Sequence, residues 1–151
     1  MVYFLKEDLA LLEDRIKETI AKIEEVGNEL RLATTQSSET WHDNFGFENA
    51  QQQARLLSRR LDDLEQLRRS AITVEHPKDF KTVAIGHKVI VADAETGETK
   101  TFHIGSYVTF TAHTISYASP IGLLLLNKKI GQHAKGAMGT KQVEFEIIDI
   151  A

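Results

Sequence analysis

The sequence predicts an α+β protein with two domains: an antiparallel α-helical coiled-coil hairpin over residues 1–75 and an antiparallel β-sheet with a short helix over residues 76–151. Three observations carry this prediction. Apolar residues recur at heptad spacing on both sides of a polar turn, Pro77 ends the helical pattern, and period-two runs of β-branched residues begin after Phe80. The change of period near Pro77 therefore sets the domain boundary.

The first helix is predicted by an apolar stripe over residues 5–30. Its members alternate in spacing between four and three, which is the spacing of a coiled-coil seam, and charged residues fill the positions between them. One side of this helix should therefore face a partner helix. The stripe consists of Leu5, Leu9, Leu12, Ile16, Thr19, Ile23, Val26 and Leu30.

A second stripe with the same spacing predicts that partner helix. The first pattern stops after Ala33 in a run of residues that favour caps and turns, so the chain is expected to reverse direction there. The two helices then pair antiparallel, and the tip of the hairpin lies at about residues 34–47. The second stripe consists of Phe47, Ala50, Ala54, Leu57, Leu61 and Leu64, with its phase continuing through Arg68 to Ala71.

The C-terminal domain is predicted from period-two patterns of β-branched residues and from the residues that favour turns and helix caps. Residues 88–92 and 99–104 read as a β-hairpin whose turn uses Gly97 for a positive φ. Ser119 caps a short helix that opens with Pro120 and runs through Leu126. Two further strands are expected at residues 107–111 and 142–150.

Composition narrows the classes of function. The chain of 151 residues contains no cysteine, which excludes disulfides, thiolate zinc sites and cysteine nucleophiles. Its apolar runs are too short to span a membrane, and a reducing cytoplasm is the expected location. Residues 1–75 hold 10 Lys and Arg against 15 Asp and Glu, so we do not expect sequence-specific binding to duplex DNA. An acidic arm suits a partner that presents positive charge or bound metal.

Two motifs on this frame carry a family resemblance. Glu48-Asn49-Ala50 lies at the predicted tip, and Ser119-Pro120-Ile121-Gly122 is followed by Leu124-Leu125 and a lysine-rich turn. With the N-terminal coiled coil, these motifs resemble the Gre family of bacterial transcript cleavage factors over nearly the whole chain. The C-terminal motif is the more specific of the two.

The resemblance implies a fold, a partner and a role. It implies an FKBP-like C-terminal domain that docks on bacterial RNA polymerase through Ser119, Pro120 and Ile121, while the coiled coil enters the secondary channel. Carboxylates at the tip, Asp43 and Glu48, would act on the backtracked RNA 3′ end through a Mg²⁺ ion shared with the polymerase. The protein would then be a monomer that binds no cofactor alone and stimulates the nuclease activity of the polymerase without being an enzyme itself.

The tip departs from the family pattern Asp-Leu-x-Glu-Asn-Ala-Glu-Tyr. Glu48 matches the family glutamate, but Phe45 occupies the aspartate position and Gln52 the tyrosine position. Asp43 precedes Glu48 by five residues, which on a helix separates them by about 140°. The two can share a metal only if residues 44–46 are non-helical, which Gly46 permits. Glu39 and Asp43 form a second possible acidic pair.

Each candidate residue also has a structural interpretation. Asp43 can cap the second helix and Glu48 can favour its positive N-terminal end. Trp41 can close the hairpin end or contact the polymerase channel. Arg55 and Arg59 share a helix face, where they can line the channel near RNA phosphates or pair with the nearby acids Asp62, Asp63 and Glu65.

Two further classes of function remain open at this point. The altered tip is compatible with a channel-binding regulator or inhibitor that does not stimulate cleavage. The C-terminal domain is also compatible with a peptide-binding or prolyl isomerase module, although its few aromatic residues make a proline-sized cage harder to build.

Overall fold

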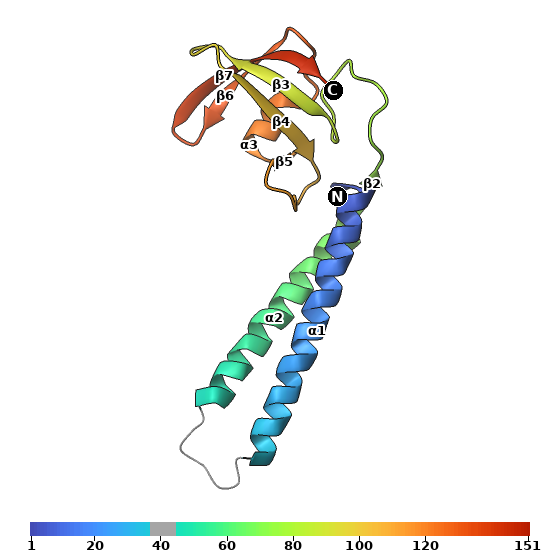
Figure 1. Cartoon of the computed structure of the whole chain (residues 1–151), viewed down its shortest axis with the longest axis vertical. Coiled ribbons are helices and arrows are strands. Elements are labelled where there is room, and N and C mark those ends of the chain that lie inside the picture. The colour runs from blue at the N-terminus through green and yellow to red at the C-terminus, as the bar shows by residue number, and fades with distance from the viewer. Residues whose placement is uncertain (37–44) are drawn as a thin grey trace. The chain divides into compact units, whose positions relative to one another are not determined.

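The structure, a computed structural model, describes residues 1–36 and 45–151 of the chain (Figure 1). These residues form two compact units. One unit is Ala10–Ser70, and the other combines Met1–Leu9 with Ala71–Ala151. The predicted α+β class with an N-terminal helical region and a C-terminal sheet is therefore confirmed. No helix in the described ranges is long and apolar enough to cross a membrane.

The helical unit is an antiparallel pair of long helices, α1 (Lys6–Gln36) and α2 (Phe45–Ser70), which lie side by side in Figure 1. Their apolar stripes are buried or half-buried, whereas most of the charged residues between stripe positions are exposed. Leu12 and Val26 on α1 and Ala50 on α2 are the most deeply buried apolar members. The polar member Thr19 is buried in the seam as well. Its Oγ1 donates a hydrogen bond of 2.8 Å to the carbonyl oxygen of Arg15, which satisfies the buried hydroxyl. The predicted seam is confirmed.

Both outer ends of the predicted hairpin are strands instead of helix. β1 (Val2–Leu5) pairs in parallel with β2 (Ala71–Val74), in the register Val2↔Ala71 to Leu5↔Val74. Leu5 is thus the last residue of a strand, and the helical phase that we extended to Ala71 ends at Ser70. The β-branched residues of β2 favour a strand, and pairing with β1 outweighs one more helical turn.

This two-stranded sheet is bonded to the C-terminal unit. Leu5 N donates to Ser106 Oγ at 2.8 Å, and that buried hydroxyl donates in turn to the carboxylate of Asp8. Tyr107 N donates to the carbonyl oxygen of Tyr3 at 3.0 Å. The first nine residues, which we assigned to the hairpin, therefore belong to the same compact unit as the C-terminal sheet.

The main sheet has five strands in the order β5-β4-β3-β7-β6. It is mixed, because β5 pairs in parallel with β4 while the other neighbours are antiparallel, so the expectation of a purely antiparallel sheet needs this correction. The predicted strand at 107–111 is wrong, because that segment is irregular and the strand comes later. The strands are β3 (Lys88–Asp93), β4 (Thr99–Gly105), β5 (Thr114–Ser116), β6 (His133–Met138) and β7 (Lys141–Ile150).

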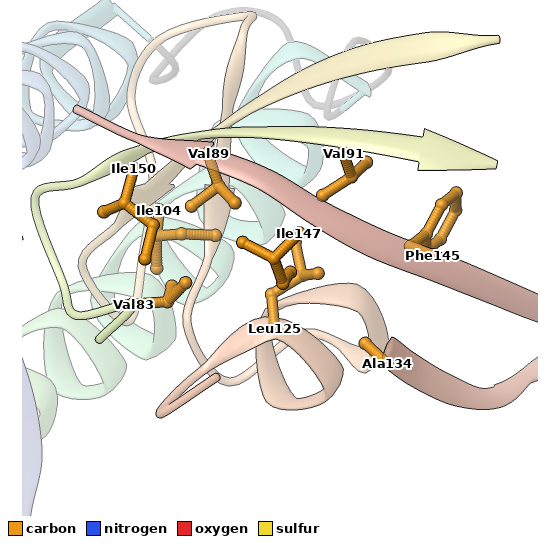
Figure 2. Close-up of a cluster of buried hydrophobic side chains, with 9 residues drawn as sticks. All are labelled: Val83, Val89, Val91, Ile104, Leu125, Ala134, Phe145, Ile147 and Ile150. Carbon is orange, nitrogen blue, oxygen red and sulfur yellow. The ribbon is translucent and has the colours of Figure 1, made fainter. Parts of the chain in front are cut away.

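The core of this unit lies between the sheet and the short helix α3 (Pro120–Leu125), as Figure 2 shows. Leu125 of α3 is fully buried, and so are Val89 and Val91 of β3 and Ile147 of β7. The register of β3 and β7 shifts between Ile90 and Val91, which leaves Ile148 out of the pairing. Alternation places Ile148 on the face opposite Ile147, where it is 43% exposed, and the bulge shifts the phase so that Ile150 is buried in place of Asp149.

The turn between β3 and β4 has the predicted chemistry. Gly97 has a φ of 71°, which confirms its role as the residue with positive φ. Asp93 Oδ1 accepts hydrogen bonds from Glu95 N at 2.9 Å and Thr96 N at 3.4 Å. The first of these bonds is the main reason that the pKa of Asp93 is lowered.

A buried histidine lies at the start of β3. His87 is 1% exposed, its Nδ1 accepts a hydrogen bond of 3.0 Å from Ala84 N, and its Nε2 has no partner among the described residues. The ring of Phe80 lies 5.2 Å from the imidazole, centroid to centroid. Burial lowers the pKa of His87, so the folded protein holds the neutral form.

We expect Leu12→Ala to lower the free energy of unfolding of the helical unit by about 2–5 kcal/mol, because it removes a side chain that is 1% exposed in the seam. Leu11→Ala is the matched control. Because Leu11 is 40% exposed, this substitution should lower the free energy of unfolding by about 0.5 kcal/mol or less. Urea denaturation followed by circular dichroism measures both. Equal losses in the two variants would contradict the seam.

We expect the protein to lose stability as the pH falls below about 6.5, because the unfolded chain protonates His87 and the folded chain does not. His87→Asn keeps an acceptor for Ala84 N and removes the titrating ring, so it should reduce the slope of stability against pH by up to about 1.4 kcal/mol per pH unit. Urea midpoints at pH 5, 6 and 7 test this. Val83→Ala is the control, since it should lower stability about equally at each pH; an unchanged slope in His87→Asn would refute the expectation.

Candidate functional site

Glu48 lies exposed in the first turn of α2. The seam explains its exposure, because Phe47 is half-buried and Ala50 is buried on the side that faces α1, which leaves the positions between them pointing away from the seam. A carboxylate in this turn is favoured by the unsatisfied N–H groups of the helix end. The local structure therefore presents one carboxylate to solvent at the start of α2.

The segment just before Glu48 is helical where the structure describes it. Phe45 and Gly46 lie in α2, so the condition under which Asp43 and Glu48 can share a metal, a non-helical segment over residues 44–46, is not met at these two positions. Packing along the seam favours continuing the helix through Gly46, and it outweighs the low helix propensity of glycine, which costs about 1 kcal/mol relative to alanine. Trp41, Asp43 and the alternative acid Glu39 lie outside the described residues.

Arg55 and Arg59 are both exposed on α2. The pairing that we considered with the neighbouring acids does not form among the described residues, and one of those acids, Glu65, pairs with Arg69 at 3.2 Å. The other ion pair of α2 joins Arg68 Nε to Glu13 Oε1 of α1 at 2.8 Å. Arg55 and Arg59 thus present their charges to solvent one helical turn apart.

The Ser119-Pro120-Ile121-Gly122 motif builds a tight corner between β5 and α3. Ser119 caps α3: its Oγ accepts a hydrogen bond of 3.1 Å from Gly122 N and donates one of 2.6 Å to the carbonyl oxygen of Ser116. A Cβ on Gly122 would lie only 2.2 Å from that same carbonyl oxygen. The predicted cap at Ser119 is confirmed, and only glycine fits at position 122.

An apolar groove of about 390 Å³ lies beside this corner. Exposed Pro120 and half-buried Ile121 contribute to its lining from α3, and Met138 from the end of β6. The remaining lining residues are Ile115, Ser116, Ser119 and Gly139. The three residues predicted for docking therefore share one concave surface.

Sequence reasoning missed the part of this groove that comes from β6. His133–Met138 is rich in alanine and glycine and carries a lysine, which are residues depleted in strands, so no pattern predicted it. Its Gly136 lies against Leu124 of α3, where an added Cβ would come within 2.4 Å. A glycine inside this segment was the available signal in the sequence, since glycine in a strand often marks the close approach of another element, here α3.

The described residues form no cluster of three or more histidine or acidic side chains that would hold a metal ion. Glu48 on its own supplies a single carboxylate, which is a ligand type suited to Mg²⁺. Any ion at this end of α2 would thus need most of its ligands from elsewhere.

Comparisons with known proteins identify the family of the chain. Residues 76–151, half of the chain, match the family model described as "Transcription elongation factor, GreA/GreB, C-term". The transcription elongation factor GreA of Amoebophilus asiaticus is 28% identical over 99% of this chain and 96% of its own, and GreA of Thermosipho melanesiensis is 29% identical over 72% and 70%. The crystal structure of the GreA factor homolog Gfh1 of Thermus thermophilus is 23% identical and covers 99% of this chain and 98% of its own, with a TM-score of 0.47. The chain belongs to the GreA/GreB family of transcription elongation factors.

Proposed function

We propose that this protein binds bacterial RNA polymerase, inserts its α1–α2 hairpin into the secondary channel and stimulates cleavage of backtracked RNA by the polymerase. Membership of the GreA/GreB family supports the partner. The observation that carries the proposal is the exposed carboxylate of Glu48 in the first turn of α2, at the position of the family glutamate. The rigid seam of the two helices would keep that carboxylate at the end of a stiff rod.

In this proposal Glu48 acts through a metal site that the polymerase completes. Glu48 would donate a carboxylate oxygen to a weakly held Mg²⁺ ion of the polymerase active centre. Because Phe45 and Gly46 are helical, Asp43 would add a second oxygen donor only through a turn of the chain before Phe45. The ion would activate water for attack on the RNA phosphodiester. The protein itself would have no turnover alone, bind no cofactor alone and contact the nascent RNA 3′ end only indirectly.

The proposed docking surface is the groove beside α3. Pro120 and Ile121 offer apolar contact area in a concave site of about 390 Å³, and the Ser119 cap fixes their positions. An apolar core surrounded by polar residues suits a protein partner. Arg55 and Arg59 would line the path of the hairpin, where their free charges can interact with RNA phosphates. The protein would act as a monomer in the cytoplasm.

A second candidate function has its own supporting observation. Phe45 and Gly46 are helical, so part of the loop that would bring Asp43 beside Glu48 is absent. A tip with one well-placed carboxylate would still occupy the channel. The protein would then regulate or inhibit the polymerase without stimulating cleavage.

We expect Glu48→Ala to reduce cleavage of RNA in stalled polymerase complexes by at least about tenfold, because it removes a ligand of the shared metal. Asp43→Ala should have a similar effect. Glu29→Ala removes an exposed carboxylate near the end of α1 and should leave cleavage unchanged. Gel analysis of labelled RNA with Mg²⁺ measures the three variants.

The same assay separates the two candidate functions. Wild-type protein that leaves stalled RNA at full length and slows nucleotide addition would favour the inhibitor. Cleavage that is as extensive with Glu48→Ala as with the wild-type protein would reject the proposed role of the carboxylate.

We expect Pro120→Asp to weaken polymerase binding by about tenfold or more, since it places an unpaired charge in the docking groove. An acid is tolerated at the first position of a helix, so the melting temperature should stay close to that of the wild type. Fluorescence anisotropy with labelled protein measures the affinity. Ala94→Asp in the exposed β3–β4 turn is the control. An equal loss of affinity in both variants would show that the groove is not part of the interface with the polymerase.

A further inference from the structure

A second apolar pocket, of about 310 Å³, lies within the C-terminal unit and away from the groove beside α3. It shares no lining residue with that groove, and nothing in the proposed function uses it. Tyr3 of β1 and Tyr117 after β5 contribute aromatic rings. Its apolar lining is completed by Val74, Pro77, Ala84, Ile85 and Leu126.

The walls of this pocket are held by hydrogen bonds of the backbone. Tyr3 N donates to the hydroxyl of Tyr117 at 3.1 Å, and the two rings lie 6.0 Å apart. Asn127, another lining residue, donates from its backbone N to the carbonyl oxygen of Val83 at 2.9 Å, and Val83 N donates to that of Lys128 at 2.8 Å. The pocket is therefore preformed, which lowers the entropic cost of filling it.

Two polar side chains of the pocket, those of Glu75 and Asn127, have no partner among the described residues. Glu75 lines it with an exposed carboxylate that makes no hydrogen bond or ion pair with any described residue. Asn127 lines it as well, with a φ of 65°, and its side-chain amide has no partner in the described part of the chain. No lysine or arginine is among the lining residues, so nothing from the lining neutralises Glu75.

This combination selects the chemistry of an occupant. Tyrosine rings attract a cation that lies over their faces within about 6 Å, and arginine makes this contact more often than lysine. The carboxylate and the amide oxygen can accept hydrogen bonds from a guanidinium group, while the apolar lining covers its methylene stem. A volume at the low end of ligand pockets, about 300–1,000 Å³, suits one side chain better than a larger molecule.

The geometry points to a recognition pocket for an arginine side chain of a partner protein, in which Glu75 and Asn127 bind the guanidinium group against Tyr3 and Tyr117. Its acidic lining residue distinguishes this pocket from the groove beside α3, which has no acidic residue in its lining. Arginine binding in this pocket does not depend on Glu48, so the proposal can be tested separately from transcript cleavage.

Titration of the full-length ¹⁵N-labelled chain with three capped tripeptides tests the pocket directly. The probes are acetyl-Ala-Arg-Ala-amide, its citrulline analogue, which is a neutral isostere of arginine, and its norleucine analogue, which offers an apolar stem alone. We expect the arginine peptide to shift the backbone amides of Glu75, Ala84 and Asn127 with a Kd of roughly 1 mM, and to bind at least about tenfold more tightly than either analogue.

Two variants and one control locate the effect. Glu75→Gln keeps the shape of an exposed side chain and should raise the Kd of the arginine peptide by about fivefold or more. Tyr3→Leu keeps an apolar side chain and should also weaken binding. Glu98→Gln removes an exposed carboxylate in the β3–β4 turn, outside the pocket, and should leave the Kd unchanged.

Several results would overturn the proposal. Equal binding of the citrulline or norleucine peptide would show that the cation is not recognised. Shifts confined to other residues, or no shift up to about 20 mM peptide, would show that the pocket does not bind this side chain. An equal loss of affinity for the arginine peptide in Glu75→Gln and Glu98→Gln would show that the peptide responds only to the net charge of the protein.

Discussion

The burial of one continuous apolar seam between α1 and α2 is the interaction on which the rest of the molecule depends. A single helix gains little stability from propensity alone in water, because most helical stability in proteins comes from the packing of an amphipathic face. The pairing removes Leu12, Val26 and Ala50 from solvent and thereby fixes which side chains remain outside. Glu48, Arg55 and Arg59 are exposed for that reason, and their proposed roles all follow from the seam.

The sequence predicted the seam because heptad spacing leaves little freedom: each of the apolar positions expected on the two helices is buried or half-buried. The ends of the hairpin were less predictable. Leu5 fits the helical phase, yet the parallel pairing of β1 with β2 gives its backbone better partners, and sixty-odd residues separate the two strands. A contact between segments so distant in the chain leaves no local pattern in either one.

The C-terminal unit shows the same contrast. Turn and cap chemistry is local, so Gly97 and Ser119 were predicted and confirmed. The strand β6 has a weak propensity of its own and forms because it pairs with β7 and packs against α3 through Gly136. The groove that we propose for docking was therefore predicted only on its α3 side. The role of Asp43 stays a prediction, since that residue lies outside the described part of the chain.

Cross-linking from position 48 tests the central claim most directly, namely that the seam delivers this residue to the active centre of the polymerase. A photoreactive amino acid in place of Glu48, irradiated in a complex with bacterial RNA polymerase, should label polymerase residues next to the catalytic Mg²⁺. The same group at Glu18, exposed midway along α1, should label a different part of the polymerase. Labelling only on the outer surface of the polymerase from position 48, or no labelling at all, would contradict the account.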